Sequence, residues 1–577
     1  MLLREQKDIL FDKITHFASF SDKITIEKEL PLCYNNLHFP TFIIFSWEFI
    51  MFKYFQNHIK SFLLPCLIFS ALTGILSAIA VTAFKLAAQG VIHVSESIYS
   101  FVRTDPKFLP LLILGAAGIG IISSLILSIS HTCRGGGIPS SVAAIRGLTS
   151  FKWLASIFVL PFSALLTFLC GIPLGTEGPC VQMGTAIGDG VIRCFGKEKH
   201  LGWRRYIMTG GGSAGFSLAA SSPITAIIFS TEELSKHFSP MLLTVASLSV
   251  AFAQITSQIL SFFGIGSTSL FHIGNIPTLD LKYLAAPLII GLICGISSII
   301  FTKLYHLIDK LMRTVLGKLS SKVVFPVIFA FVALVGFFLS DTLGNGHSLT
   351  DKLLYSNAAW YLLIIVFLIR AAAMMLSNTA GTTGGIFLPT LAFGAIIGSL
   401  SAKAMISLGI ISEEFYILSV VLGIASFLGA TSRIPITACI FAIEALGCTG
   451  NVLSVIISTT ASLLTVELSG LEDFTDTVIN ATISRIHKGK TPSVIEVSLT
   501  VKKTSFVIGK ERRDILWPNS CTLVSFERAQ KNKGNTEIGE GDIITLHYKT
   551  YDPAATAKEI EILVGEQSSE VKAIMIP

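Results

Sequence analysis

A glutamate lies between two glycines and a proline in an apolar part of the chain, at Gly175-Thr176-Glu177-Gly178-Pro179. A carboxylate in such surroundings is costly and usually marks function. Proline suits the first turn of a helix, where the N–H group that it lacks has no intrahelical partner. The glycines let an anion approach that turn, at the positive end of the helix dipole. We therefore expect Glu177 to be a tethered anion beside a site for mobile anions; a plain helix cap is the alternative.

Two other stretches have the same construction. Gly135–Pro139 (GGGIP) and Gly385–Pro389 (GIFLP) each place glycine before a proline that can begin a helix. One glycine-rich loop before a helix is a weak signal, but its repetition in one apolar region strengthens it. We expect the anion to lie between the helix starts at Gly175–Pro179 and Gly385–Pro389.

The composition indicates a polytopic membrane protein. The chain has 577 residues, a mean hydropathy of +0.70, 51% hydrophobic and only 14% charged residues, whereas soluble domains average about a quarter charged. The net charge of +6 comes without basic clusters interleaved with aromatics, so nucleic acid is not an expected partner. The ten cysteines show neither CxxC nor zinc spacing. We expect free thiols, no metal and no cofactor.

Several apolar stretches approach or exceed the roughly 17–25 residues that a spanning helix needs. They are 61–84, 110–130, 153–171, 240–264, 284–301 and 323–340. Lysine and arginine gather in the loops 193–205 and 303–322, which predicts that these loops are cytoplasmic.

An internal repeat is the strongest pattern in the chain. Pro223–Glu232 reads PITAIIFSTE and Pro435–Glu444 reads PITACIFAIE, identical at seven of ten positions. The glycines and proline around Glu177 recur at an offset of 210. Transporters built from such repeats bind their substrate between the halves, at the ends of broken helices. The repeat alone leaves open whether the halves are parallel or inverted.

The two halves differ at acids. Glu177 corresponds to Phe387, and Glu233 corresponds to Ala445, whereas the neighbouring Glu232 has a glutamate counterpart. An acid without a partner in the other half is the better candidate for function, which selects Glu177 and Glu233. The alternative for Glu233 is a solvated acid at a helix end.

An enzyme is not the favoured interpretation. Gly211–Gly215 matches the G-x-S-x-G pattern of serine hydrolases, but that pattern needs a strand–turn–helix context that is missing here. Small residues at this spacing in a membrane helix more often form a packing surface.

The composition divides the chain into three parts. Residues 1–57 form an extension of uncertain structure, in which Met51 is an alternative start; 58–486 form the transmembrane domain; and 487–577 form a small soluble α+β domain. In that last domain we expect a helix after Pro553. Its expected strands are Val494–Val501, Thr522–Phe526 and Asp542–Tyr548.

Residues 58–484 resemble the CLC family of chloride channels and proton-coupled chloride antiporters. That family's motifs GSGIP, GxEGP and GxFxP stand here, in order, as GGGIP, GTEGP and GIFLP. The resemblance implies an all-α, inverted-repeat fold of about eighteen helices, many of them broken half-helices. It also implies a homodimer in the cell membrane with one pore per subunit.

The resemblance also implies residue roles. Glu177 would be the gating glutamate, and Glu233 the internal acid that relays protons in the antiporters. The implied anion-binding positions are Gly136, Gly137, Ile138, Gly178, Ile386, Phe387 and Phe474. A carboxylate in a site of low dielectric competes with an anion when charged and withdraws on protonation, which links the two fluxes.

The chain departs from the family at two of these positions. Gly136 replaces the filter serine and Phe474 the central tyrosine, so backbone amides must carry more of the anion site. We expect an antiporter that exchanges chloride for protons; a passive voltage- or pH-gated channel, or an antiporter for nitrate or fluoride, are the alternatives. Residues 491–577 resemble the C-terminal lobe of an RCK (TrkA-C) domain, which implies a cytoplasmic module that binds a small ligand and a bacterial or archaeal source.

Overall fold

The computed structural model describes residues 62–577 except for 136, 150–151, 197, 267–270, 272, 275, 317–318, 356–357, 487–492, 504, 519–520, 530–535, 552, 565–571 and 574–577. The expected N-terminal extension, 1–57, therefore lies wholly outside the described residues. The helices that precede the C-terminal sheet are α3 (Leu64–Thr104), α4 (Leu109–Ile126), α5 (Ile138–Ile145), α6 (Trp153–Leu169), α7 (Glu177–Phe195), α8 (Arg204–Ala220), α9 (Pro223–Phe229), α10 (Pro240–Phe262), α11 (Ala285–Leu311), α12 (Ser321–Phe338), α13 (His347–Tyr355), α14 (Trp360–Ala380), α15 (Phe387–Ser407), α16 (Tyr416–Ser432), α17 (Pro435–Glu444), α18 (Val452–Glu467) and α19 (Phe474–Ile486).

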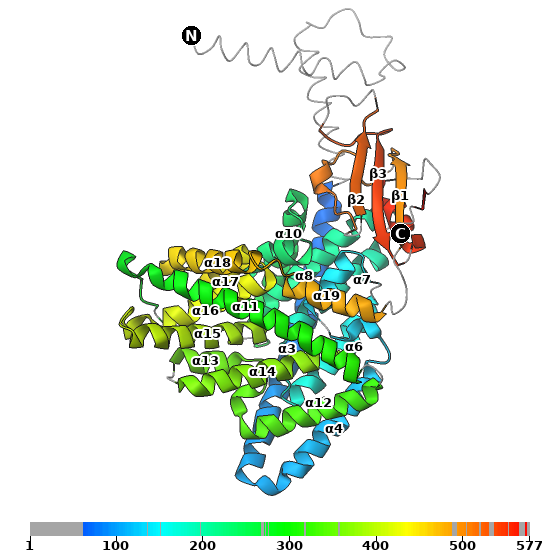
Figure 1. The fold of residues 1–577 in the computed structure, drawn as a ribbon. Helices are drawn as coiled ribbons and strands as arrows, with labels where there is room; N and C mark the ends of the chain where they lie inside the picture. The colour runs from blue at the N-terminus through cyan, green and yellow to red at the C-terminus, as the bar shows by residue number, and fades with distance from the viewer. Residues whose placement is uncertain are drawn as a thin grey trace, which may run out of the picture. The chain divides into compact units, whose positions relative to one another are not determined.

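This helical part is a multi-pass membrane domain. Among the described residues, nine helical segments are long and apolar enough to cross a bilayer. The predicted apolar stretches 61–84 and 110–130 correspond to α3 and α4, although α3 continues beyond its apolar stretch to Thr104, just before Pro106. Helices such as α5, α9, α13 and α17 are much shorter (Figure 1). Short helices place their ends inside the membrane domain, where those ends can form a site.

Prolines lie at the start of three of these short helices, α5, α9 and α17. Pro223 and Pro435 are the first residues of α9 and α17, and Pro139 is the second residue of α5. The helix before each repeated proline ends alike: Ser221 and Arg433 both adopt left-handed backbone, with φ of 54°. The same break in both halves confirms that the repeat is structural as well as sequential.

Each half contains one especially close helix pair. A Cβ atom on Gly184 of α7 would lie 2.0 Å from the carbonyl oxygen of Gly211 in α8. In the other half, a Cβ on Gly394 of α15 would lie 2.7 Å from the carbonyl oxygen of Gly423 in α16. Gly211 belongs to the hydrolase-like stretch, which is thus confirmed as a packing surface within α8.

The C-terminal part folds around a sheet in the order β2-β3-β1-β4, and all of its neighbouring strands are antiparallel. The predicted strands and the helix after Pro553 are present. Their bounds are β1 (Ser493–Thr500), β2 (Cys521–Glu527), β3 (Ile543–Thr550), β4 (Lys572–Ala573) and α20 (Pro553–Val564). The side chain of the buried Asp542 closes the turn before β3 by accepting a hydrogen bond from the amide of Gly539 at 2.9 Å.

Candidate functional site

The three glycine motifs meet, backbone against backbone. The amide of Gly175 donates to the carbonyl of Gly385, and the amide of Gly385 donates back to Gly175, both at 2.7 Å. A Cβ on Gly178 would lie 2.6 Å from the Cα of Gly385 and 3.1 Å from that of Gly137. Side chains at these positions would force the loops apart, so glycine is required for the helix starts to converge.

Glu177 is completely buried at this junction. Its Oε1 accepts a hydrogen bond from the hydroxyl of Thr176 at 3.1 Å, whereas its Oε2 has no partner among the described residues. A Cβ on Gly175 would lie 2.5 Å from that Oε2, which shows that the carboxylate rests on the glycine. The carboxylate therefore lies where the helix starts meet, with one oxygen unsatisfied.

Most of the expected anion-binding residues are at this junction. Ile138, Gly178 and Phe387 lie in the first turns of α5, α7 and α15, where amides have no intrahelical acceptor. Ile386 immediately precedes α15 as its N-cap. The amide of Gly137, by contrast, donates to Oε1 of Gln182 at 2.7 Å and is already used. Gly136 lies outside the described residues.

Phe474 begins α19 and is buried. Its ring meets that of Phe301 at 5.3 Å and that of Tyr305, nearly perpendicular, at 4.8 Å between centroids. The position where the family has a tyrosine is thus occupied by a phenylalanine within an aromatic cluster. The hydroxyl in this cluster belongs to the neighbouring Tyr305.

Glu233 lies in a π-helical turn, Ser230–Leu234, that continues α9, and its side chain is 1% exposed. The hydroxyl of Thr475 donates to its Oε1 at 2.6 Å, and its Oε2 has no partner among the described residues. The alternative of a solvated acid at a helix end is wrong, because the extra residue of the π-turn keeps the side chain in the protein interior. Thr475 was missed because no sequence pattern connects it with residue 233.

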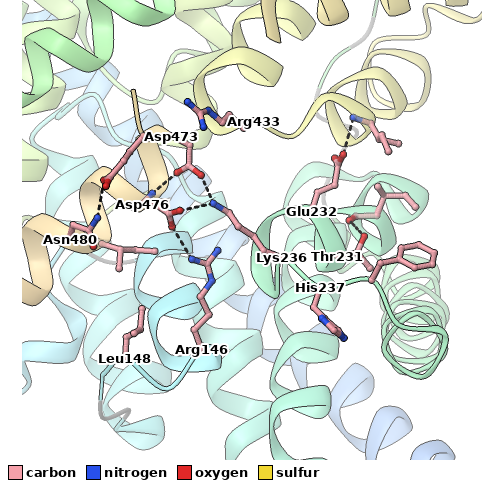
Figure 2. Close-up of a pocket in the computed structure, with 15 residues that line it drawn as sticks. Arg146, Leu148, Thr231, Glu232, Lys236, His237, Arg433, Asp473, Asp476 and Asn480 are labelled. Atoms are coloured by element: carbon pink, nitrogen blue, oxygen red, sulfur yellow. Dashed lines mark hydrogen bonds and ion pairs between the residues drawn. The ribbon is translucent and has the colours of Figure 1, made fainter. Parts of the chain in front are cut away.

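Ion pairs surround the backbone that carries Thr475. Lys236 bonds both Asp473 and Asp476, the latter at 2.8 Å, and Arg146 bonds the other oxygen of Asp476 at 2.8 Å (Figure 2). The cluster tethers the start of α19 to α5 and to the segment after Glu233. It borders a cavity of about 720 Å³ that Glu232 also lines.

Glu232 has a different role from its neighbour. Its carboxylate accepts from the amides of Ile436 at 3.2 Å and Thr437 at 2.7 Å, at the start of α17. Its counterpart Glu444 accepts from the amides of Ile224 at 2.9 Å and Thr225 at 2.8 Å, at the start of α9. The acids that both halves share therefore cap each other's helices reciprocally, as a pseudo-two-fold relation between the halves requires.

A lysine that the sequence reading passed over lies near Glu177. Lys85 is 9% exposed, and its Nζ donates to the carbonyls of Leu218 at 2.8 Å and Ala219 at 3.2 Å. It lines a cavity of about 260 Å³ together with Glu177. The signal that could have found it is a single lysine within the long apolar helix α3.

The C-terminal part contacts the first residues of α8. Arg204 bonds Asp189 of α7 at 2.5 Å and Glu559 of α20 at 2.9 Å, and Arg205 bonds Glu559 at 2.6 Å. The ring of Phe506 packs on Tyr206 at 6.0 Å between centroids. An acid of the C-terminal part is thus linked to the membrane domain through two arginines.

A second set of contacts reaches the segment that follows Glu233. His237 bonds the carbonyl of Arg513 at 2.6 Å, and Ser239 donates to Asp514 at 3.0 Å. The amide of Leu516 donates to the hydroxyl of Tyr206 at 3.0 Å. The C-terminal part therefore touches the chain within four residues of Glu233.

Comparisons with known proteins agree with this geometry. The H(+)/Cl(-) exchange transporter ClcA of Vibrio campbellii (strain ATCC BAA-1116) is 25% identical over 435 residues, covering 72% of this chain and 89% of that protein. A slow cyanobacterial Cl-/H+ antiporter has a similar fold, with a TM-score of 0.66 and 19% identity over 73% of this chain and 98% of that one. A CLC-type fluoride/proton antiporter follows with a TM-score of 0.58 and 20% identity, over 70% and 95% respectively.

The family model agrees as well. The model described as voltage gated chloride channel matches residues 118–467, which contain all three glycine motifs, both unshared glutamates and both copies of the repeat. The chain belongs to the voltage gated chloride channel (CLC) family.

Proposed function

We propose that this protein is an antiporter that exchanges chloride or a related anion for protons. The observation that carries the proposal is the pair of buried acids, Glu177 and Glu233, each with one carboxylate oxygen that has no partner among the described residues. A permanently charged buried carboxylate without partners is unfavourable, so each acid is suited to take up and release a proton. Relatives named as proton-coupled exchangers support the same conclusion.

In the proposed cycle, Glu177 is the gate. Its charged carboxylate occupies the place where the starts of α5, α7 and α15 converge, and it competes there with an anion for the helix amides. Protonation removes that competition and lets an anion bind. Glu233 then exchanges protons with the opposite side of the membrane. Each proton that reaches Glu177 therefore changes anion occupancy, which couples the fluxes.

Purified protein in liposomes tests the proposal. An imposed chloride gradient should drive protons uphill, measured with a pH electrode, while chloride flux is followed separately. Intact chloride flux without proton movement would mean a passive channel, and the antiporter proposal would fail.

The identity of the anion follows from the same site. Phe474 offers no hydroxyl, so selection falls on backbone amides and on the size of the site. We expect chloride to be transported, with nitrate competing more strongly than in a site that has side-chain hydroxyls. Flux in the presence of chloride, nitrate or fluoride alone measures this order.

We further propose that residues 487–577 are a cytoplasmic RCK-C-like domain that regulates transport through a small ligand. The contacts of His237 and Ser239 with residues 513 and 514 support the proposal, since a movement of the domain would act on the segment that carries Glu233. Glu559→Gln should weaken the link to Arg204 and Arg205. An unchanged ratio of proton to chloride flux, with an unchanged transport rate, would contradict the proposed regulation.

A homodimer is proposed as well. Ile224 and Ile436, at matching positions of the reciprocally capped helices α9 and α17, are both more than half exposed and give a symmetric apolar surface. Mass determination of the protein in detergent tests the dimer.

A further inference from the structure

An apolar groove lies between the end of α3 and the start of α4. It has a volume of about 260 Å³, and Phe101 of α3 and Leu111 and Gly115 of α4 are among the residues that line it. Both helices are long and apolar enough to cross a bilayer. The side chains of Phe101 and Leu111 are 56% and 65% exposed. The groove therefore opens towards the surrounding lipid.

The walls of the groove are fixed from behind by α12 (Figure 1). Near the end of α3, the guanidinium of Arg103 donates to the carbonyls of Gly336 at 2.7 Å and Phe337 at 3.1 Å. On α4, a Cβ atom on Gly120 would lie only 2.9 Å from the Cα of Pro326. Both walls are thus anchored to the same helix, which holds the groove open.

Water is not the expected occupant of the groove. Among the described residues that line it, no side chain is charged, and the hydroxyl of Tyr99 already donates to the carbonyl of Cys170 at 2.9 Å. Apolar cavities that offer water no polar partners stay dry and take up apolar ligands. A Cβ atom on Gly115 would meet nothing within 4 Å, so this glycine adds depth to the groove. Inside a bilayer, the apolar ligand at hand is a lipid acyl chain.

Charged residues lie at the mouth of the groove, in the connection from α3 to α4. Arg103, Asp105 and Lys107 are two cations and one carboxylate, which leaves one positive charge there. The Lys107 ammonium is 3.6 Å from the Asp105 carboxylate, and its side chain is 85% exposed. Lys107 precedes Phe108, which lines the groove. A lysine at the end of spanning helices reaches the level of the lipid headgroups, where it attracts phosphate.

We propose that the groove of Phe101, Leu111 and Gly115 binds one acyl chain of a phospholipid whose phosphate lies at Lys107. The chain fills the space beside Gly115, and the phosphate is held by the excess positive charge at the mouth. Such a site is independent of the proposed anion exchange, since neither Glu177 nor Glu233 lines the groove.

Titration of the full-length protein in detergent with dioctanoylphosphatidylglycerol, followed by native mass spectrometry, tests the groove. We expect Gly115→Leu to raise the Kd about tenfold or more, because the leucine side chain takes the place of part of the acyl chain. Gly118→Leu is the matched control. A Cβ atom there also meets nothing within 4 Å, but Gly118 is not among the described residues that line the groove.

The Kd of Gly118→Leu should equal that of the wild type. An unchanged Kd in Gly115→Leu, or equal weakening by both variants, would overturn the proposal. Phe101→Ala keeps the test independent of the folding of Gly115→Leu, because it shortens a half-exposed wall of the groove. It should raise the Kd about fivefold, and an unchanged Kd would contradict the site.

Dioctanoylglycerol distinguishes a phospholipid from any other source of acyl chains, because it carries the same chains without a phosphate. Its Kd should be about threefold weaker than that of dioctanoylphosphatidylglycerol and should not respond to Lys107→Gln. Lys107→Gln should weaken the binding of dioctanoylphosphatidylglycerol by a similar factor. Equal Kd values for the two compounds, with no effect of Lys107→Gln, would overturn phospholipid as the occupant.

Discussion

Glu232 and Glu233 are neighbours in the chain but differ in almost every contact. Glu232 accepts hydrogen bonds from two helix-start amides and has a counterpart, Glu444, with the same role in the other half. Glu233 is buried, bonded through one oxygen to Thr475, and has no acidic counterpart. Glu232 links the two halves through hydrogen bonds, whereas Glu233 keeps one carboxylate oxygen without a hydrogen-bond partner among the described residues.

The same contrast separates Glu177 from Phe387. Both begin a helix at equivalent positions, but the Phe387 ring packs edge-on against Phe216 at 5.0 Å while the Glu177 carboxylate has an oxygen without a partner. Positions that the two halves share therefore maintain the scaffold, whereas the candidate functional acids lie at positions where the halves differ. Five substitutions test this division.

Glu177→Gln should have the largest effect. The neutral side chain cannot carry a proton, so we expect proton transport to fall about 100-fold or more while anion flux persists without dependence on pH. Paired proton and chloride measurements in liposomes check this. Anion flux that still varies with pH would show that Glu177 is not the gate.

Glu233→Gln should also abolish proton transport while chloride still crosses, because this acid is proposed to serve the proton alone. Thr475→Val tests its positioning: losing one hydrogen bond to Oε1 should slow proton transport about fivefold, with chloride binding unchanged. If Thr475→Val alters chloride binding and leaves proton transport intact, the bond to Glu233 has no part in proton transfer.

Glu444→Gln should affect stability and leave coupling alone. Replacing a charged acceptor at the start of α9 costs about 1 kcal/mol. A lower thermal midpoint with an unchanged ratio of proton to chloride flux is the expected result, and Glu232→Gln should behave alike. Loss of coupling in either variant would contradict the division between shared and unshared acids.

The smallest predicted effect lies in the C-terminal part. Burial lowers the pKa of Lys510 from 10.5 to about 8, and its amine lies 3.7 Å from the centre of the Phe506 ring. The unfolded chain thus binds more protons than the folded one between these values. The contribution of Lys510 should therefore make the protein more stable as the pH increases from about 8 to 10.5, and it should stay level below about 8.

Lys510→Met should flatten that pH dependence, because the residue no longer titrates. Thermal midpoints between pH 7.5 and 10 measure the change, and Lys503→Met, at an exposed lysine of the same part, is the control. An equally steep dependence in Lys510→Met would assign the effect to another group.

The sequence by itself determined the class of protein, the repeat and the location of the chemistry. Apolar runs predict spanning helices because a bilayer leaves few other solutions for the backbone. Proline and glycine predicted the starts of α5, α7 and α15, since both residues act through local backbone geometry. Comparison of the halves selected Glu177 and Glu233, because an acid that the scaffold alone required would be expected in both halves.

Only the tertiary structure decided which partners meet. The bond of Thr475 to Glu233 joins residues 242 positions apart, and Lys85 reaches the carbonyl of Leu218 across 133. The surroundings of Arg134 could not be predicted either, since the residues that line the cavity beside it come from separate helices. No local sequence pattern encodes such contacts, because they depend on how helices that are far apart in the chain pack against one another.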